Sequence, residues 1–342
     1  MLTFGVFDHL DDYGAPLGRL LENRLKLVEL LEREGYFAYH LAEHHTTPLG
    51  VVPSPSVFLS AAIQRTSRIR LGPLVYVLPL YHPLRLFEEV CMLDHMSGGR
   101  MMLGVGRGGA LLEHQRYGID PVAAPAMYHE AFAVMMRAFE SDVLNFEGKY
   151  YNYRDFVVQA RPLQRPHPPL WYGAPSAEAV GWAAPRAVNV VSLGPAARAR
   201  EIADRYRKEW NALGRDAKEL PMIGITRHIV VAATDREAKD IAARNYPRWR
   251  EAMEFIWKRA GAEFKLAGIY TRDFASLEHI GHGIAGSPAT VRDFIAGLQR
   301  DTGVNYVLGQ MAFGAMTEEE IGNSVRLFAR EVMPAFAGAR AA

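Results

Sequence analysis

Residues 68–109 read RIRLGPLVYVLPLYHPLRLFEEVCMLDHMSGGRMMLGVGRGG and contain two apolar runs separated by an amphipathic stretch. The run at 69–78 is almost continuously apolar, whereas a strand with one solvated face would alternate apolar and polar residues. Continuous apolar runs are typical of parallel strands that are buried on both faces. The stretch at 83–96 has the apolar spacing of a helix, so the segment predicts a strand, a helix and a second parallel strand at 101–106.

The same alternation of β-rich runs and amphipathic stretches continues along the chain, with no short repeat. We predict eight strands, at 2–7, 37–42, 69–78, 101–106, 170–174, 188–193, 222–232 and 305–311. Helical patterns lie between them, at 19–34, 54–66, 83–96, 126–140, 176–184, 196–213, 235–260, 288–300 and 317–333. Strands distributed to the C-terminus favour an α/β fold, a single (β/α)8 TIM barrel over residues 1–342. A doubly wound parallel sheet shows the same alternation and is the alternative fold.

Two stretches are longer than an ordinary connection between a strand and a helix. Residues 141–168 follow the fourth strand and contain a Glu147-Gly148 turn between aromatic residues, which predicts a β-hairpin outside the barrel. Residues 246–287 follow the seventh strand and are rich in aromatic residues, glycine and histidine. An insertion here would leave the end of the barrel where active sites form, so we interpret it as a candidate lid.

The composition excludes several classes of partner. The 342 residues include 39 basic and 38 acidic side chains, without the excess positive charge that binding to nucleic acid or an anionic membrane requires. No run of about 18 uncharged apolar residues occurs, and the N-terminus has no signal-peptide pattern. Cys91 is the only cysteine, which excludes an intrachain disulfide and a cysteine-rich metal site. We expect a cytoplasmic protein with a small-molecule substrate and no metal.

The second predicted strand ends in AEHHTT at 42–47. Alternation along a strand would send the side chain of His44 one way and those of Glu43 and His45 the other. An imidazole titrates near neutral pH, so a histidine at the barrel mouth could transfer protons. The alternative is a structural histidine that is hydrogen-bonded within the barrel rim. Metal binding is disfavoured, because adjacent side chains on a strand diverge.

The ends of the fourth and fifth strands could bind an anion. GVGRGG at 104–109 surrounds Arg107 with glycines, which allow a ligand to approach the backbone, and a guanidinium suits a phosphate. A simple turn is the alternative interpretation. After the fifth strand, YGAPSAEA at 172–179 places Ser176 at the expected N-cap of a helix, where free N–H groups could also hold a phosphate. Capping alone would explain Ser176 equally well.

Several stretches together resemble one known family. They are AEHH at 42–45, the segment 68–108 within the stretch quoted above, GSPATVRDFIAGL at 286–298 and GVNYVLGQMAFG at 303–314. In this order, and over nearly the whole chain, they resemble the bacterial luciferase-like flavin-dependent monooxygenases. The resemblance implies a (β/α)8 barrel that binds FMN, or a related flavin, at the carboxyl ends of the strands. It also implies a separate flavin reductase that supplies reduced FMN, and a homodimer formed through helices near the second and third strands.

The resemblance also implies roles for individual residues. His44 matches the active-site histidine beside the flavin, and Arg107, with the backbone around Gly106 and Gly108, matches the contact to the flavin phosphate. Further cofactor-binding positions implied in the same way are Leu74, Val75, Ala174, Ser176, Ala177 and Ser192. Relatives commonly carry a non-prolyl cis peptide at the position of Leu74 and Val75, and we expect one here.

Two departures from the family pattern limit what the resemblance implies. The luciferase catalytic chain has a reactive cysteine where this chain has Gly106, so light emission is not implied. Some relatives place a basic residue early in the fourth helix, and PAMYHEAF at 125–132 has no clear match to it. The phosphate would then be held mainly by Arg107.

These expectations describe a two-component monooxygenase that uses reduced FMN and O2 to oxygenate a small organic substrate. We expect the substrate to contact Phe7, Asp8, Tyr76 and residues 246–287, whose aromatic and aliphatic side chains suit an apolar or carbonyl-bearing molecule. An F420-dependent oxidoreductase, which transfers hydride without oxygen, is one alternative. A non-catalytic flavin-binding protein on the same fold is another.

Overall fold

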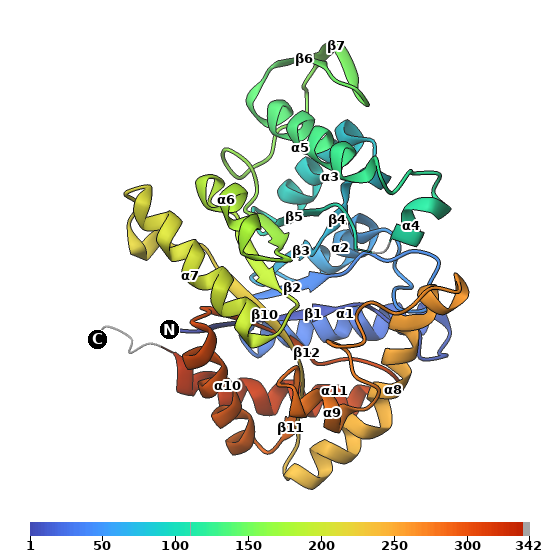
Figure 1. Ribbon diagram of the computed structural model, residues 1–342, viewed down its shortest axis with the longest axis vertical. Coiled ribbons are helices and arrows are strands. Elements are labelled where there is room, and N and C mark those ends of the chain that lie inside the picture. The colour runs from blue at the N-terminus through green and yellow to red at the C-terminus, as the bar shows by residue number, and fades with distance from the viewer. Residues whose placement is uncertain (110, 338–342) are drawn as a thin grey trace.

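Parallel strands form a barrel surrounded by helices in the computed structural model, which describes residues 1–109 and 111–337 (Figure 1). The barrel strands are β1 (Thr3–Asp8), β2 (Ala38–Leu41), β3 (Arg70–Pro73), β4 (Tyr76–Val77), β5 (Leu103–Gly106), β8 (Leu170–Gly173), β9 (Asn189–Ser192), β10 (Ile223–Val231) and β12 (Tyr306–Gln310). Neighbours pair in the order β3-β2-β1-β12-β10-β9-β8-β5-β4, and every pair along this path is parallel.

The ends of this strand order meet, so the sheet is a barrel and the doubly wound alternative is excluded. β3 and β4 are two parts of one barrel strand, interrupted at Leu74 and Val75. The peptide bond between these two residues is cis, as the resemblance implied. β4 pairs with β5, and a bridge between Leu71 and Met101 joins β3 to the same side. The fold class predicted from the sequence is therefore confirmed.

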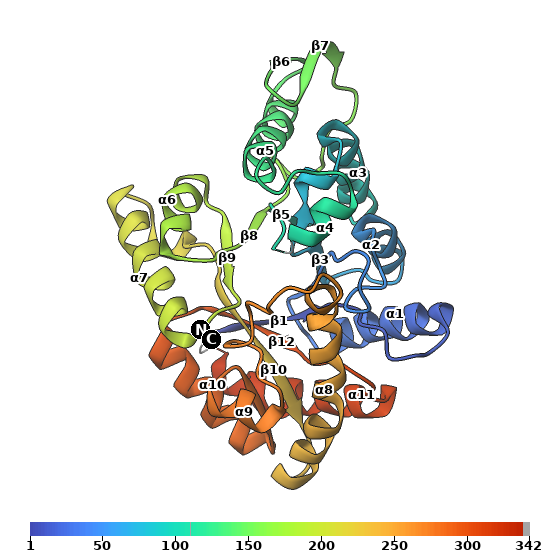
Figure 2. The ribbon, with the colours of Figure 1, turned by 45° about the vertical axis from the view of Figure 1, so that its right-hand side comes forward.

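Helices cover the outside of the barrel (Figures 1 and 2). They are α1 (Leu17–Arg33), α2 (Pro55–Gln64), α3 (Pro83–Met96), α4 (Leu111–Arg116), α5 (Ala124–Glu140), α6 (Val180–Ala183), α7 (Ala196–Ala212), α8 (Asp235–Arg259), α9 (Phe274–His279), α10 (Pro288–Thr302) and α11 (Glu318–Leu327). The local sequence explains where several of these helices begin or end. A capping box of Thr317 and Glu320 starts α11, proline occupies the first turn of α3 and α10, and Gly303 at φ +68° ends α10.

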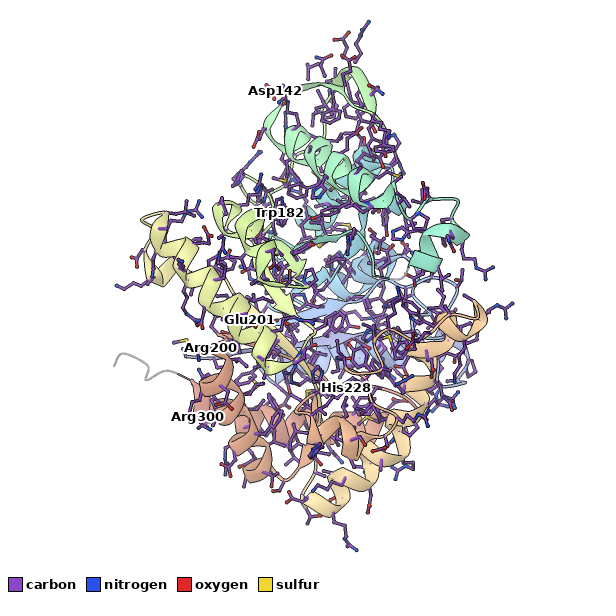
Figure 3. All side chains as sticks on the ribbon, viewed as in Figure 1. Asp142, Trp182, Arg200, Glu201, His228 and Arg300 are labelled. Carbon is purple, nitrogen blue, oxygen red and sulfur yellow. The ribbon has the colours of Figure 1, made fainter. Side chains whose placement is uncertain are left out.

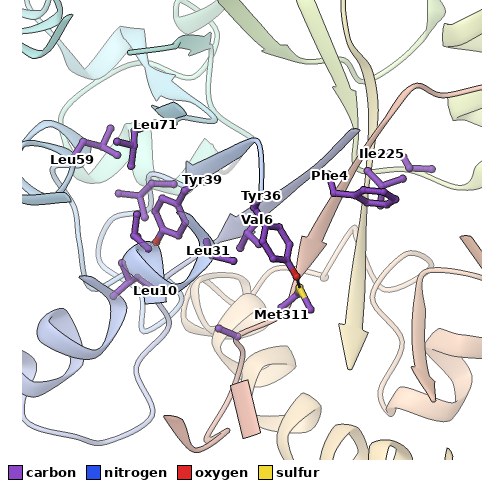
Figure 4. Packing of buried hydrophobic residues seen from close by; sticks show 14 of the residues in the cluster. Phe4, Val6, Leu10, Leu31, Tyr36, Tyr39, Leu59, Leu71, Ile225 and Met311 are labelled. Carbon is purple, nitrogen blue, oxygen red and sulfur yellow. Dashed lines mark hydrogen bonds between the residues drawn. The ribbon is translucent and has the colours of Figure 1, made fainter. Parts of the chain in front are cut away.

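Alternation along each strand divides the core into two layers. One face of the strands fills the barrel interior, with Phe7, Ala38, Ala42, Leu74, Met102, Trp171, Val191, Tyr306 and Leu308. The other face packs against the helices, where Tyr39 of β2 lies with Leu10, Leu59 and Leu71 (Figure 4). Because inward and outward residues alternate, the side chain just before or after an inward one belongs to the outer layer. This parity decides which residues at the strand ends can reach a ligand.

The predicted hairpin is present within 141–168. β6 (Val143–Glu147) and β7 (Asn152–Val157) pair antiparallel, and they lie beyond α5 and away from the barrel (Figure 2). The carboxylate of Glu130 accepts hydrogen bonds from the backbone N–H groups of Lys149, Tyr150 and Tyr151, and so ties the turn to α5.

The segment 246–287 begins with the end of the helix predicted at 235–260 and contains two further elements that were not predicted. Helix α8 continues to Arg259, and α9 and the short strand β11 (Gly283–Gly286) occupy the end of the segment. β11 pairs parallel with the end of β10, a pairing that the sequence analysis missed because the strand has four residues, two of them glycine. The coil between α8 and α9, residues 260–273, is the irregular part.

None of the helices within residues 1–109 and 111–337 combines the length and the apolar character needed to cross a membrane. Over the same residues, no group of three or more histidine, cysteine or acidic side chains is arranged to hold a metal ion.

Candidate active site

A cavity of about 490 Å³ opens at the carboxyl ends of the barrel strands. Its walls come from the ends of β1, β2, β4, β5, β8 and β9, together with α8 and the coil that follows it. Of the predicted site residues, those that line it are Phe7, His44, Leu74, Val75, Gly106, Arg107, Gly108 and Ala174. Six consecutive strands of the barrel order therefore bring most of the predicted residues to one site.

His44 is paired with a carboxylate. Its Nδ1 lies 3.1 Å from Oε1 of Glu113, a residue of α4 whose side chain is buried. Burial by itself would lower the pKa of His44, but the charge and hydrogen bond of Glu113 outweigh burial, and the pKa is raised. Burial would likewise raise the pKa of Glu113, but His44 lowers it. The two shifts favour an imidazolium and a carboxylate at neutral pH, with the second ring nitrogen of His44 left for a ligand.

The adjacent residues form a second buried pair. Oε1 of Glu43 lies 2.8 Å from Nε2 of His45, and its Oε2 accepts hydrogen bonds from the N–H of Val77 and the hydroxyl of Tyr81. The hydroxyl of Tyr117 lies 3.0 Å from Nδ1 of His45. These bonds use the carboxylate of Glu43 and both ring nitrogens of His45 structurally, which leaves His44 as the histidine of the motif that faces the cavity.

His9 also lines the cavity, at the end of the first strand, where the sequence allows it to face the barrel mouth but assigns it no role. Its ring stacks on that of His44, with centroids 5.6 Å apart and planes 19° from parallel. Burial, followed by the charges of His44 and His228, lowers its pKa well below the ordinary value. His9 is therefore a neutral, buried neighbour of a charged His44.

The glycines around Arg107 are explained mainly by packing. A Cβ at Gly104 would lie 1.9 Å from the carbonyl oxygen of Pro73, and a Cβ at Gly106 would lie 2.5 Å from Cγ2 of Val75. Glycine at both positions allows β5 to approach the chain at the cis peptide. The side chain of Arg107 is exposed on the cavity wall, and it forms no ion pair with any residue in 1–109 or 111–337.

Three predicted residues lie in the outer layer instead of the cavity. Asp8 follows the inward-facing Phe7, so its carboxylate points outward, where it bonds the hydroxyl of Tyr39 at 2.9 Å and pairs with Arg24 at 3.2 Å. The hydroxyl of Tyr76 bonds that of Ser56, also outside the barrel. Substrate contact by these two residues is not supported.

Ser192 is the third predicted residue that lies in the outer layer instead of the cavity. It follows the inward-facing Val191, and its Oγ accepts the N–H of Gly194. Ser176 precedes a short 3-10 turn (Ala177–Ala179) but does not cap it with its side chain. Neither it nor Ala177 belongs to the cavity wall. Among the ionisable residues of the cavity wall, Glu113 and Arg198 were not predicted, whereas Lys265 lies in the segment 246–287 that was expected to contact the substrate. The position of His9 follows from parity, because it is two residues after Phe7.

The model of the luciferase-like monooxygenase family matches residues 2–306 of the chain. The chain belongs to the luciferase-like monooxygenase family. Among curated proteins, this luciferase-like monooxygenase is 41% identical over 314 residues to the uncharacterized protein y4wF of Sinorhizobium fredii, a match that covers 92% of this chain and 91% of the relative. It is 25% identical, over 77% of its length and 72% of the relative's, to the oxygenase component of a flavin-dependent trigonelline monooxygenase of Acinetobacter baylyi.

Several solved structures share the fold. The monooxygenase RslO1 of Streptomyces bottropensis has a TM-score of 0.87 at 25% identity, over 98% of this chain and all of that one. Two structures that show the fold alone are named for different cofactors. One is the oxygenating constituent of 3,6-diketocamphane monooxygenase of Pseudomonas putida in complex with FMN, with a TM-score of 0.78 at 20% identity, over 98% of this chain and 99% of that one. The other is the coenzyme F420 dependent tetrahydromethanopterin reductase of Methanopyrus kandleri. It has a TM-score of 0.71 at 22% identity, over 98% of this chain and 99% of that one.

Proposed function

We propose that this luciferase-like monooxygenase is the oxygenase component of a two-component system, which uses reduced FMN and O2 to oxygenate a small, largely apolar organic substrate. The observation that carries the proposal is that His44, paired with Glu113, and Arg107 open into the same cavity at the strand ends. A trigonelline relative is named as an oxygenase component, which supports a separate flavin reductase as partner.

The residues of the cavity fit a flavin. Leu74, Val75 and Ala174 give an apolar surface for a planar ring system, and Arg107 gives a charge for a phosphate at the end of β5. Reduced flavin, when bound, supplies the electrons and the reaction with oxygen. The protein then has to bind it, orient the substrate, move a proton and limit access of water.

Proton transfer is the role of His44 in this proposal. Glu113 keeps the imidazole charged and fixes Nδ1, so that a proton is held on the ring at the cavity wall. The neutral His9 stacked on it limits the number of charges at this point.

We assign the exclusion of water from the cavity to α8 and the coil 260–273. Met253, Ile256 and Trp257 from the helix, with Leu266 and Ile269 from the coil, form an apolar wall over the cavity. We propose that this wall is the lid that the sequence predicts within 246–287. An apolar cover would protect reduced flavin from side reactions with solvent.

Oxygen consumption tests the proposal. The purified protein is mixed anaerobically with reduced FMN, and oxygen uptake is followed after addition of aerated buffer and candidate substrates. We expect tight binding of reduced FMN and, with a suitable substrate, less hydrogen peroxide formed per oxygen consumed, because one oxygen atom then enters the substrate and the other leaves as water. The variant His44→Ala should retain flavin binding and lose roughly 10²–10⁴ in turnover, the usual contribution of a placed acid or base. Unchanged turnover in this variant would exclude the proton-transfer role.

The alternative is an F420-dependent hydride transfer, since an F420-dependent reductase shares the fold. The same apparatus separates the two functions. Reduced F420 would be oxidised by substrate under anaerobic conditions if the alternative is correct, and substrate would not lower the yield of hydrogen peroxide from reduced FMN.

A further inference from the structure

The cavity of this protein has an uneven distribution of charge. Its acidic residues, Glu43 and Glu113, are both engaged by histidines and backbone N–H groups. Its basic residues Arg107, Arg198 and Lys265 line the same space, and none of them pairs with a carboxylate from residues 1–109 or 111–337. The flavin phosphate proposed above accounts for Arg107 and leaves two cations unexplained.

Arg198 lies on the wall formed by the end of β9 and the start of α7, beside a second arginine. Its Nη1 lies 3.0 Å from the place that a Cβ of Gly194 would occupy. Nη1 of Arg227 donates to the carbonyl oxygen of the same glycine at 3.3 Å. Two guanidinium groups therefore pack against one glycine of the cavity wall.

Arg227 is fully buried, yet its charge is not balanced. Its Nε and Nη2 have no hydrogen-bond partner among the described residues, and no carboxylate there lies within ion-pair distance. Burial lowers its pKa to about 9, so the guanidinium stays charged at neutral pH. The nearby His282 adds no further positive charge at neutral pH, because burial and then the two arginines lower its pKa to about 4. An unpaired buried charge is costly, and an anion placed beside it would be stabilised.

The surroundings of Arg198 restrict the rest of the ligand. Leu193, Ile256, Trp257 and Ile269 line the cavity with it, so that apolar side chains adjoin the cation. A ligand that satisfies both features has an apolar body and one negatively charged end. FMN carries a single phosphate, and Arg107 lies at the end of β5, separated from β9 by β8 in the barrel.

We propose that the β9–α7 wall binds the carboxylate of the organic substrate, with Arg198 as its direct ligand, Lys265 on the covering coil as a second cation, and Arg227 behind Gly194 as a fixed positive charge. The substrate class is thus an apolar acid, ionised at neutral pH. This inference rests on the proposed function, because it assigns the cofactor's phosphate to Arg107.

Binding measurements test the inference without knowledge of the true substrate. Octanoate and octan-1-ol, which differ in the terminal charge, are titrated into the full-length protein and followed by calorimetry and by tryptophan fluorescence, since Trp257 lines the cavity. We expect the wild type to bind octanoate roughly tenfold or more tightly than octan-1-ol, the effect of one charged hydrogen bond or more.

Three variants make the result specific. Arg198→Met should remove the preference for octanoate, and Arg198→Lys should retain part of it. The control Arg200→Met changes the same helix at an exposed residue outside the cavity, labelled in Figure 3, and should behave as wild type. Equal binding of octanoate and octan-1-ol by the wild type, or an unchanged preference in Arg198→Met, would overturn the inference.

FMN and riboflavin, both reduced, form the second arm. Arg198→Met should leave the preference for FMN over riboflavin unchanged. A loss of that preference would show that the arginine holds the flavin phosphate, and the inference would be wrong. If the wild type binds neither flavin, the proposed function fails, whatever the octanoate titration shows.

Discussion

At the scale of single residues, the ion pair of His44 and Glu113 controls the protonation of the site. The pKa of His44 is raised, so the ion pair stabilises the fold at lower pH, where the imidazole is protonated. This stabilisation is lost as pH rises through the pKa of His44. The pKa of Glu113 is lowered, so its carboxylate stays charged to lower pH. The ion pair is lost when the pH falls through this pKa and the carboxylate is protonated. The pair therefore exists in the window between these two values, which is wider at both ends than the ordinary pKa values of the two groups would give.

Removing the carboxylate should shift this window. In Glu113→Gln the charge of Glu113 is lost, and burial opposes only the remaining charge of Glu43, so we expect the pKa of His44 to fall relative to wild type. If turnover requires protonated His44, the alkaline limb of the pH profile of kcat moves to lower pH by the same amount. Glu147→Gln, on the exposed hairpin, is the control. An unmoved alkaline limb would show that the pair does not set the charge of His44 during turnover.

Arg107 carries a second prediction at this scale. Replacing it by alanine removes the cation assigned to the flavin phosphate, and we expect reduced FMN to bind more weakly by about 1.5–3 kcal/mol, the scale of a hydrogen bond to a charged group. Reduced riboflavin, which has no phosphate, should bind the variant and the wild type alike. Arg116→Ala, on the exposed face of α4, is the matched control. Equal loss of both flavins would point to a general disturbance of the loop.

At the scale of elements, the hairpin depends on its contact with α5. A Cβ at Gly148 would lie 2.1 Å from Oε1 of Glu130, the carboxylate that binds three N–H groups of the turn. Gly148→Ala should therefore disturb these bonds and lower the free energy of unfolding by about 1–3 kcal/mol.

The variant should leave flavin binding unchanged, because the hairpin lies away from the cavity. Gly181→Ala in α6 is the control, since nothing lies within 4 Å of its added Cβ. Denaturant unfolding, followed by circular dichroism, measures both. Equal stability of the two variants would show that the turn can move at little cost.

At the scale of the whole molecule, we propose the homodimer that the family resemblance implies, through α2 and α3. Val57 on α2 and Met92 on α3 are 70% and 62% exposed, and these helices pack side by side. Apolar side chains exposed on adjacent helices are common at interfaces between subunits. Val57→Asp combined with Met92→Asp should convert a dimer to a monomer in light scattering, whereas Leu213→Asp at the end of α7 should not. A wild-type monomer would refute this interface.

The sequence by itself determined the order of strands and helices, because apolar runs and helical spacing are local properties. It also indicated the hairpin and the strand ends that bear His44 and Arg107. The cis peptide at Leu74 and Val75 came from the family resemblance and is confirmed. The short strand β11 was missed, because two glycines in four residues give little periodic signal.

Only the tertiary structure decided which side chains share the cavity. Parity along the strands turns Asp8 and Ser192 outward, although both belong to correctly predicted strands. Tyr76 points outward although Leu74, two residues earlier, points inward, because the barrel strand is interrupted between β3 and β4. Glu113 and Arg198 come from α4 and α7, and their approach to the cavity depends on how the helices pack around the closed barrel. Pairing between residues far apart in the chain follows from barrel closure and helix packing, which no local pattern encodes.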